Sequence, residues 1–186
     1  MELWVIWNRK FMEKELHYYL EIGAGGAERV IRDAEQYPER HYVVIDLDEP
    51  KDIKRLPGNI RWFFGGITKK RGIPIPDGEI DEVNIDYVLG SIYGDAGYEE
   101  SAERILQEAA RVLQADGKMI IREPKYMVDN IVPIVEKLNL EYEALPMPLE
   151  EAKQHSESIK EAAREFEDGY IEMEPYLITV EKKKSS

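Results

Sequence analysis

A chain of 186 residues is long enough for one domain with a sizeable buried core and too short for two ordinary domains. Its 38 Asp and Glu residues outnumber its 25 Lys and Arg residues, and the formal net charge of -13 opposes binding to the phosphates of nucleic acids. It has no cysteine, which excludes disulfides, thiolate catalysis and cysteine-based metal sites, and its three histidines are too scattered to suggest a metal site.

The first element in the chain is a short apolar run that leads into a glycine turn. Residues 18–22 predict a strand with a carboxylate at Glu21, three glycines follow by Gly26, and a helical pattern begins near Ala27. Glycines let the backbone approach a ligand closely, and the free N–H groups at the start of the helix face the same place. The segment therefore predicts a strand, loop and helix with a ligand at the loop.

The second apolar run, residues 41–46, also ends in a carboxylate, Asp46. Nucleoside-binding folds place the acidic residue that accepts hydrogen bonds from the ribose at this point. The two strand ends thus point at one nucleoside-like ligand. A dinucleotide-binding fingerprint would have Gly or Ala where this chain has Glu28, which argues against NAD.

The rest of the chain alternates between strand and helix patterns. With the two runs above, strands are predicted at residues 18–22, 41–46, 60–64, 79–89, 118–123, 140–145 and 170–180. A helical stripe covers residues 102–113, and a further helix starts near Asp129 with Pro133 in its first turn. Such alternation indicates an α/β fold, with a parallel sheet of about seven strands covered by helices on both faces.

Between the last two predicted strands, residues 149–166 carry one apolar stripe and predict an amphipathic helix. The stripe must be buried, and two alternatives stay open. The helix forms a lid or wall over the substrate side of a pocket, or it forms the interface of a homodimer. His155 lies on this helix and could be a general base, or simply a surface residue.

Residues 21–27, Glu-Ile-Gly-Ala-Gly-Gly-Ala, resemble the first motif of the class I S-adenosylmethionine-dependent methyltransferases, acidic-x-Gly-x-Gly-x-Gly, with Ala27 in place of its last glycine. Residues 73–83 and 109–117 look like the second half of ubiquinone-biosynthesis-type and related small-molecule methyltransferases, and the resemblance runs from about residue 19 to 123. It implies a three-layer, Rossmann-like methyltransferase sheet of about seven strands. The last strand would be antiparallel, and the 149–166 helix would be an insertion before it.

The resemblance implies that the cofactor is S-adenosyl-L-methionine. Gly23, Ala24 and Gly25 would lie against its methionine part, and Glu21 would help to anchor the amino group. Asp86, at the end of the fourth strand, would orient the substrate or the methionine end of the cofactor. The alternative for Asp86 is an acidic loop residue that faces water.

At the other end of the cofactor, Asp46 would accept hydrogen bonds from both ribose hydroxyls, and Leu47 would pack on the adenine. Relatives often have an acidic residue after the third strand that takes the adenine amine. This chain has Gly66 and Ile67 there instead, so backbone groups would have to recognise the adenine.

Methyl transfer mainly requires that two reactants are positioned and shielded from water, so no side-chain nucleophile is expected. The catalytic residues are therefore unknown, and the weak candidates are Asp86 and His155. Tyr87, Tyr93 and Tyr126 are possible pocket walls or parts of the core edge. Glu123 ends the fifth strand and could reach the substrate pocket, but a carboxylate before a proline is expected to be solvated.

The expected acceptor is a small molecule, with a protein side chain as the second choice. Residues 84–87 read Asn-Ile-Asp-Tyr and lack the prolines of the Asn-Pro-Pro-Tyr motif, which disfavours methylation of a flipped base or a glutamine amide. Two other functions stay open. One is a non-catalytic, cofactor-binding partner subunit, and the other is a different nucleoside-dependent enzyme such as an aminopropyl transferase or a reductase.

No apolar stretch is long enough to cross a bilayer, and the N-terminus does not resemble a signal peptide, so we expect a cytoplasmic protein without a membrane partner. Residues 1–181 are expected to form one methyltransferase domain, with Trp4 and Trp7 packing a short first segment onto it. The charged residues 182–186 are expected to form a disordered tail.

Overall fold

The computed structural model describes residues 17–25, 27–48, 55–68, 71–153, 155 and 157–183, so the segment with Trp4 and Trp7 lies outside the described residues. Seven strands form one sheet in the order β3-β2-β1-β4-β5-β7-β6. The strands are β1 Tyr18–Ile22, β2 His41–Asp46, β3 Ile60–Phe64, β4 Ile80–Asp86, β5 Leu113–Pro124, β6 Leu140–Pro146 and β7 Pro175–Lys182. The first five run parallel, and β7 lies antiparallel between β5 and β6, which confirms the predicted sheet with its antiparallel last strand.

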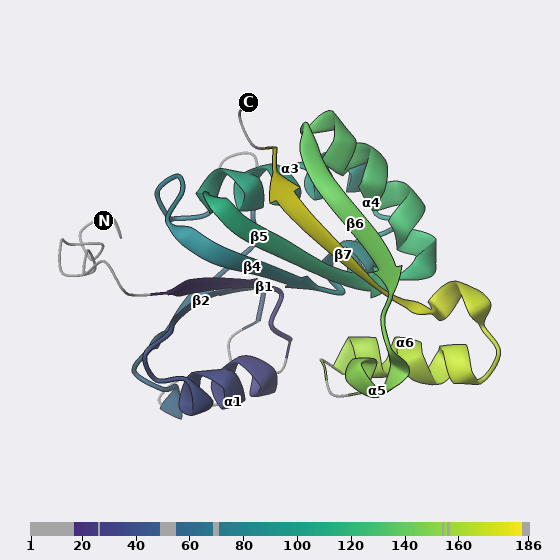
Figure 1. The fold of residues 1–186 in the computed structure, drawn as a ribbon, viewed down its shortest axis with the longest axis horizontal. Coiled ribbons are helices and arrows are strands. Elements are labelled where there is room, and N and C mark those ends of the chain that lie inside the picture. The colour runs from purple at the N-terminus through teal and green to yellow at the C-terminus, as the bar shows by residue number, and fades with distance from the viewer. Residues whose placement is uncertain are drawn as a thin grey trace.

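Helices cover both faces of the sheet and complete three layers. They are α1 Glu28–Gln36, α2 Val88–Ser91, α3 Tyr98–Val112, α4 Lys125–Lys137, α5 Leu149–Ala152, α6 Glu157–Glu167 and the 3-10 helix η3 Ile171–Met173. Figure 1 shows α3 and α4 on one side of the sheet and α1, α5 and α6 on the other. Within the described residues, no helix is both long and apolar enough to cross a membrane.

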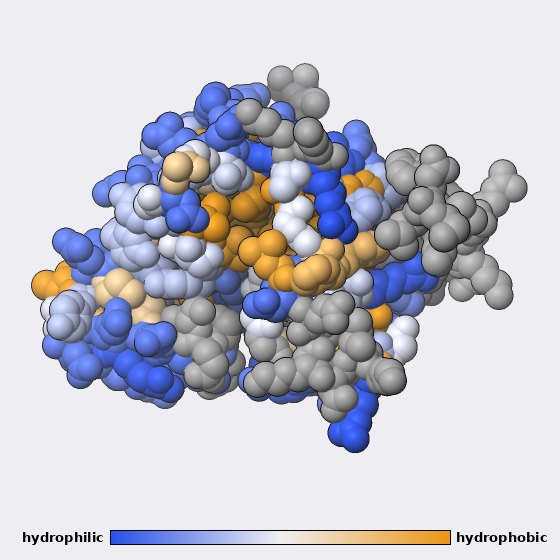
Figure 2. All heavy atoms as spheres, turned by 180° about the vertical axis from the view of Figure 1, so that it is seen from behind, coloured by the Kyte–Doolittle hydropathy of each residue, from blue (hydrophilic) through white to orange (hydrophobic). Residues whose placement is uncertain are grey.

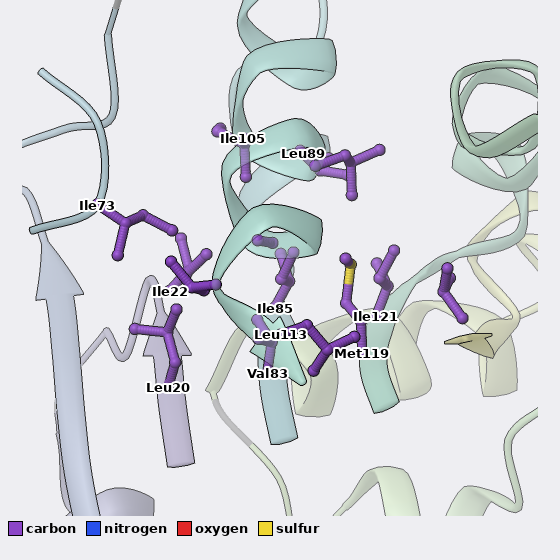
Figure 3. Packing of buried hydrophobic residues seen from close by; sticks show 14 of the residues in the cluster. Leu20, Ile22, Ile73, Val83, Ile85, Leu89, Ile105, Leu113, Met119 and Ile121 are labelled. Atoms are coloured by element: carbon purple, nitrogen blue, oxygen red, sulfur yellow. The ribbon is translucent and has the colours of Figure 1, made fainter. Parts of the chain in front are cut away.

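The main hydrophobic core lies between the sheet and the α3–α4 layer. Side chains alternate along each strand, so Leu20 and Ile22 of β1 point into this core and Glu21 points to the α1 face. Figure 3 shows the same alternation in neighbouring strands, where Val83, Ile85, Met119 and Ile121 pack beneath the helix that carries Ile105. The α1 face is therefore free to carry polar groups.

The α1 face has two separate apolar clusters rather than one. The first packs α1 against β2 and β3 and contains Val30, Ala34, Tyr42, Val44 and Ile60. The second packs α5 and α6 against the sheet and contains Met147, Ala152, Ile159 and Ala163. The side chains of β1, β4 and β5 that lie between these clusters are largely polar, and they form the candidate site described below.

The predicted helix at residues 149–166 is confirmed as a helical insertion, although the chain breaks it into α5 and α6. Ala152, Ile159 and Ala163 from its apolar stripe are fully buried, with Tyr87 and Leu177 packed against the same cluster. The stripe is thus covered by its own chain. Leu149 and Phe166 of the same stripe are only partly buried, and the homodimer through residues 149–166 stays a prediction.

The predicted end of the fourth strand and the predicted start of α4 were wrong. The fourth strand ends at Asp86, and α2 follows after Tyr87, which has a left-handed φ of 56°. Helix α4 begins directly after Pro124, so Pro133 lies inside the helix and not in its first turn. The buried stripe of α4 and its packing on β6 hold the helix across that proline, because tertiary contacts outweigh one missing backbone hydrogen bond.

The C-terminal end also differs from the prediction. Residues 171–173 form η3, and β7 starts only at Pro175. The strand then continues through Lys182, whose ammonium group donates a hydrogen bond to the carbonyl of Leu113, and Lys183 Nζ lies 2.7 Å from Asn139 Oδ1. The predicted tail from residue 182 was therefore wrong for its first two residues, because both are tied to neighbouring elements.

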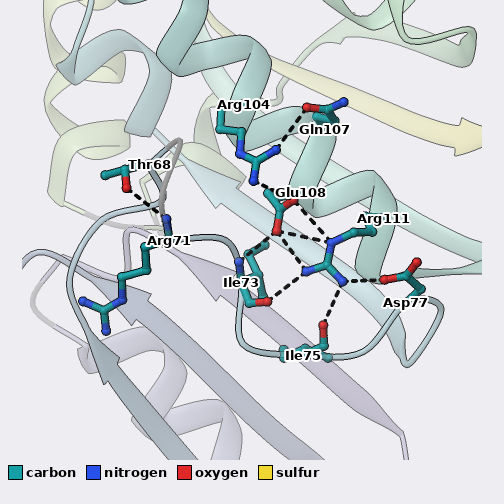
Figure 4. Close-up of polar contacts among 9 residues, drawn as sticks. All are labelled: Thr68, Arg71, Ile73, Ile75, Asp77, Arg104, Gln107, Glu108 and Arg111. Carbon is teal, nitrogen blue, oxygen red and sulfur yellow. Dashed lines mark hydrogen bonds and ion pairs between the residues drawn. The ribbon is translucent and has the colours of Figure 1, made fainter. Parts of the chain in front are cut away.

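Residues 73–83 and 109–117, the two later segments that resemble methyltransferases, contact each other. Figure 4 shows the proline-rich loop before β4 lying against α3. Arg111 donates hydrogen bonds to the carbonyls of Ile73 and Ile75, at 2.8 and 2.9 Å, and pairs with Asp77 at 2.6 Å. The Ile73 N–H donates to Glu108 at 2.9 Å. These two segments thus fix a loop to a helix, which is a structural role.

Candidate active site

The candidate site lies at the carboxyl ends of the parallel strands. Strand β1 pairs with β2 on one side and with β4 on the other, so the strand order reverses between β1 and β4. In open α/β sheets, ligands bind at this switch point. The residues that the sequence singled out follow the ends of these three strands.

The glycine loop after β1 is held close to its neighbours. Gly23 has φ +74° and donates its N–H to the carbonyl of Ile45 at 2.9 Å. A Cβ atom at Gly23 would lie 2.2 Å from Cγ2 of Val88, so only glycine fits. Ala27, in place of the motif's last glycine, is buried and keeps the left-handed φ of 64°, a conformation that costs an L-residue about 1 kcal/mol.

Asp46 is joined directly to this loop. One carboxylate oxygen, Oδ2, accepts the N–H of Gly25 at 2.9 Å, and the other, Oδ1, accepts the N–H of Asp48 at 2.9 Å. The side chain is almost buried, so the two bonds fix its orientation. Each oxygen has a second lone pair that can accept a further hydrogen bond. The structure therefore brings together the two strand ends that the sequence predicted would share a ligand.

Exposed apolar side chains lie beside Asp46. Leu47 is 66% exposed and Phe64, at the end of β3, is 54% exposed. A Cβ atom at Gly66 would lie 3.1 Å from Leu47 Cδ2, so Gly66 and Leu47 are neighbours, while Ile67 packs against the main core. Exposed apolar side chains such as Leu47 and Phe64 are typical of binding sites. Figure 2 shows where hydrophobic side chains gather on the face seen from behind.

A set of charged and polar residues, most of them buried, lies on the α1 face at the ends of β1, β4 and β5. We call Glu21, Arg29, Asn84, Asp86 and Arg122 the charge cluster. Arg29 Nη2 pairs with Glu21 and lies 3.3 Å from Asp86 Oδ2. Arg122 Nη1 lies 2.8 Å from both Asp86 Oδ1 and Asn84 Oδ1. Asp86 thus contacts both guanidinium groups. The alternative prediction, that Asp86 is a loop residue facing water, was therefore wrong.

Burial shapes the proton affinities in this region. Desolvation raises the pKa of the Glu21 carboxyl, and the Arg29 guanidinium opposes that rise. A hollow of about 60 Å³ between α1 and the sheet is lined by Glu21, Arg29 and Asn84 among others. Ionised groups with so little water around them interact strongly with any charge placed near them.

His155 is brought to the charge cluster by the insertion. Its Nδ1 lies 3.9 Å from Asp86 Oδ2, and its side chain is only 14% exposed. The expected alternative of a plain surface histidine was therefore wrong. The structure thus unites the weak candidates Asp86 and His155, although 69 positions separate them in the chain.

Glu123 was expected to be solvated, and that expectation was wrong. It is fully buried on the opposite face of the sheet from Arg122, and it accepts the N–H groups of Leu89 and Gly90 at 2.8 and 3.1 Å. Burial raises its pKa to about 8. The carboxyl group therefore holds the start of α2 in place, because those two N–H groups have no partner within the helix.

Tyr98 and Tyr126 lie near this buried carboxyl group, and Tyr93 packs against both of them. The Tyr93 ring lies 5.2 Å from that of Tyr98 and 5.7 Å from that of Tyr126. Tyr87 points instead toward the insertion, where it packs against the cluster of Met147 and Ile159. Three of the four tyrosines are at least partly buried, which fits a core edge, and only Tyr93 is strongly exposed.

Sequence reasoning missed Arg29, Phe64 and Arg122 as parts of this site. A signal existed for Arg122, because it ends the apolar run of a buried strand, where an unpaired guanidinium would be costly. Arg29 gave no such signal, since it lies on the predicted polar face of its helix. Among the described residues, no group of three or more His, Asp or Glu could hold a metal ion.

No family model matches the chain. By sequence it is similar to methyltransferase str3 of Strobilurus tenacellus, with 36% identity over 70 residues. That match covers 38% of this chain and 24% of the other protein, so the chain spans about a quarter of the length of the curated relative that it matches.

Solved structures are similar over nearly the whole chain. A TehB-like S-adenosylmethionine-dependent methyltransferase of Corynebacterium glutamicum has 20% identity and a TM-score of 0.64 over 90% of this chain and 80% of that one. The 1,6-didemethyltoxoflavin-N1-methyltransferase of Burkholderia thailandensis, with bound 1,6-didemethyltoxoflavin and S-adenosylhomocysteine, has 14% identity and a TM-score of 0.60 over 90% of this chain and 71% of that one.

A 16S rRNA methyltransferase, KamB, is similar at 15% identity and a TM-score of 0.61 over 90% of this chain and 88% of that one. The neighbours thus include proteins named for small-molecule and for ribosomal RNA acceptors. Their shared architecture is the seven-stranded sheet found here. The chain has the class I Rossmann-like fold of the S-adenosylmethionine-dependent methyltransferases, as its sequence motifs predicted.

Proposed function

We propose that this protein binds S-adenosyl-L-methionine at the ends of β1, β2 and β4 and transfers its methyl group to an acceptor. The observation that carries the proposal is the link between Asp46 and the glycine loop, in which Asp46 Oδ2 accepts the Gly25 N–H at the switch point of the sheet. This arrangement keeps one carboxylate and a tight backbone turn side by side, which suits a nucleoside joined to an amino acid.

The residues present match the chemical parts of the cofactor. The remaining lone pairs of Asp46 suit the two ribose hydroxyls, and the exposed side chains of Leu47 and Phe64 offer apolar surface to the adenine. Glu21 and the neighbouring loop of Gly23, Ala24 and Gly25 would hold the methionine part. Backbone groups of Gly66 and Ile67 would complete adenine recognition.

Bound there, the cofactor would supply an electrophilic methyl group on a sulfonium. The protein's own part is to hold the acceptor in line with that group and to exclude water. The insertion suits this part, because it covers the β4–β5 end of the α1 face and carries His155 to Asp86. We therefore place the acceptor between the insertion and the ends of β4 and β5.

A small-molecule acceptor is the proposal that the charge favours. At a formal net charge of -13, the field of the whole molecule repels a phosphate backbone. Ribosomal RNA is the acceptor named for some structural neighbours, so RNA is the alternative to be tested. Methyl-labelled cofactor, offered with a metabolite extract and with ribosomal RNA at physiological salt, separates the two by where the label appears.

The binding proposal is tested by calorimetry with S-adenosylhomocysteine. Replacing Asp46 with Ala removes charge-assisted hydrogen bonds to the ribose, which should weaken binding by about 1.5–3 kcal/mol. The matched control is Asp48→Ala, which removes the same charge from an exposed neighbour and should leave affinity nearly unchanged. Thermal unfolding of both variants checks that the loop stays folded without its bond to Asp46. Absence of binding to the wild-type protein, or equal affinity of the two variants, would rule the site out.

A further inference from the structure

Two buried polar atoms face each other without a hydrogen bond at the edge of the charge cluster. Asp86 Oδ2 and His155 Nδ1 lie 3.9 Å apart, and neither has a hydrogen-bond partner among the described residues. The Asp86 side chain is only 1% exposed. Buried polar groups are nearly always paired, and the exceptions are often found where a protein does chemistry. Hydrogen bonds between catalytic groups are often long before the substrate binds.

The insertion fixes the histidine in this position. His155 donates its backbone N–H to the carbonyl of Ala152 at 3.1 Å, and the buried Ala152 and Ile159 hold the chain on either side of it. The backbone of Asp86 is fixed by the pairing of β4 with β5. The backbone of each partner is thus tied to a neighbouring segment by a hydrogen bond or a strand pairing. A shift of about 1 Å would bring their atoms to the usual hydrogen-bond distance.

Charged groups from four elements face the imidazole. They are Asp86 of β4, Arg122 of β5, Arg29 of α1 and Glu151 of α5, whose Oε1 lies 3.8 Å from Nε2. Burial is the largest effect and lowers the pKa of His155. Both arginines also lower it, while Asp86 and Glu151 act in the opposite direction. A neutral imidazole results near neutral pH, and that is the form that can accept a proton.

Arg29 connects this pair to the proposed cofactor site. The same Asp86 oxygen that faces His155 lies 3.3 Å from Arg29, which pairs with Glu21 before the glycine loop. The histidine therefore stands near the methionine end of that site and on the opposite side from Leu47. This is the end at which an acceptor has to lose its proton.

On the basis of the function proposed above, we propose that His155 is the general base of the transfer, that Asp86 positions it, and that the acceptor presents an O–H or N–H group. As the acceptor atom forms its bond to the methyl carbon, Nε2 takes the proton from that atom. The carbon–sulfur bond breaks, and its electron pair stays on sulfur. Asp86 holds Nδ1–H and stabilises the imidazolium, which later releases its proton to water.

The test compares His155→Gln with the wild-type protein on acceptors of different acidity. Methyl-labelled S-adenosylmethionine is offered with a panel of weakly acidic phenols and primary amines, and with nitrophenols that are already ionised at pH 8. We expect transfer to the phenols or amines to fall by roughly 10²–10⁴-fold in the variant, with a much smaller loss for the nitrophenols. The acid limb of the pH profile of kcat/KM should also disappear in the variant. His17→Gln is the control, because His17 is exposed and lies at the other end of β1.

Each result decides the proposal. The proposal is overturned if His155→Gln loses activity equally on both acceptor classes or keeps the wild-type pH profile. It is also overturned if wild-type protein that binds S-adenosylhomocysteine transfers methyl groups to no member of the panel. Calorimetry with S-adenosylhomocysteine tests the general base and the proposed function separately. His155→Gln should change the affinity for S-adenosylhomocysteine less than about threefold. Failure of the wild-type protein to bind it would refute the proposed function. The positioning role has its own readout. Asp86→Asn should lower the pKa of His155 measured by NMR, and an unchanged value would refute that role.

Discussion

Arg111 offers the sharpest test of how the loop before β4 is held. Its guanidinium donates to the carbonyls of Ile73 and Ile75 and pairs with Glu108 at 2.9 Å (Figure 4). The Glu108 side chain is 7% exposed and that of Arg111 is 30% exposed. Replacing Arg111 with Ala would leave two carbonyls and a buried carboxylate without their main partner.

The size of the effect follows from these partners. Removing one member of a buried pair usually destabilises a protein by about 3–5 kcal/mol, and each hydrogen bond to a charged group contributes about 1.5–3 kcal/mol. Because Arg111 is partly exposed, water can replace some of its contacts, and the contributions are not additive. We expect the free energy of unfolding to fall by about 2–4 kcal/mol, with the melting temperature falling by roughly 5–15 °C.

Urea unfolding followed by circular dichroism measures this difference, and its pH dependence gives a second check. Burial acts to raise the pKa of Glu108, but hydrogen bonds from Arg111 and from the Ile73 N–H outweigh burial and lower it. The stabilisation from Glu108 is therefore present above its usual value of 4.5 and is lost as the pH falls through the lowered value. The gap between wild type and Arg111→Ala should be larger at pH 7 than at pH 3.

The matched control is Asp77→Ala, which removes the exposed partner of the same guanidinium. An exposed pair of this kind contributes about 0–1 kcal/mol. If Arg111→Ala loses no more stability than Asp77→Ala, or if its gap from wild type does not change with pH, then the loop is not held by Arg111 and the reasoning fails.

Two further predictions concern the glycine loop and the buried carboxyl of β5. Gly23→Ala should lose more stability and more affinity for S-adenosylhomocysteine than Gly78→Ala. Both positions have a positive φ, but only a Cβ atom at residue 23 would collide with Val88. Equal thermal unfolding of the two variants would contradict this prediction. Burial raises the pKa of Glu123 to about 8, so its stabilisation is full below 4.5 and is lost as the pH rises toward 8. Between pH 5 and pH 8.5, the free energy of unfolding by urea should therefore fall less in Glu123→Gln than in wild type, and parallel curves would count against the assignment.

The sheet could be predicted from the sequence because its strands are short apolar runs with clear ends. The runs at β1, β2 and β3 match their predicted ranges, and the order of elements leaves few topologies. The start of α4 could not be predicted in this way. Asp129 looked like a helix cap, but the buried contacts of Met127 extend the helix back to Lys125.

The candidate site was predictable only where its residues are close in sequence to a glycine turn or a strand end. Glu21, Asp46 and Asp86 satisfy that condition. The approach of His155 to Asp86 depends on how α5 and α6 fold back onto the sheet, and no local pattern encodes a contact across so many residues. The burial of Glu123 was missed for a related reason, because its partners are backbone N–H groups of a short helix that the sequence pattern did not show.

The position of β7 between β5 and β6 affects the order in which the strands can join the sheet during folding. Among the described residues, β6 pairs with β7 alone, and β7 is formed by residues 175–182. Because β7 follows the insertion in the chain and lies between β5 and β6, β6 can join the sheet only after β7 has been synthesised. The residues that we assign to the cofactor all lie before β5 in the chain, whereas His155 lies on the insertion between β6 and β7. A truncation before Pro175 should therefore disturb more than β7. It removes the strand with which β6 pairs and the Leu177 side chain that packs against α5 and α6.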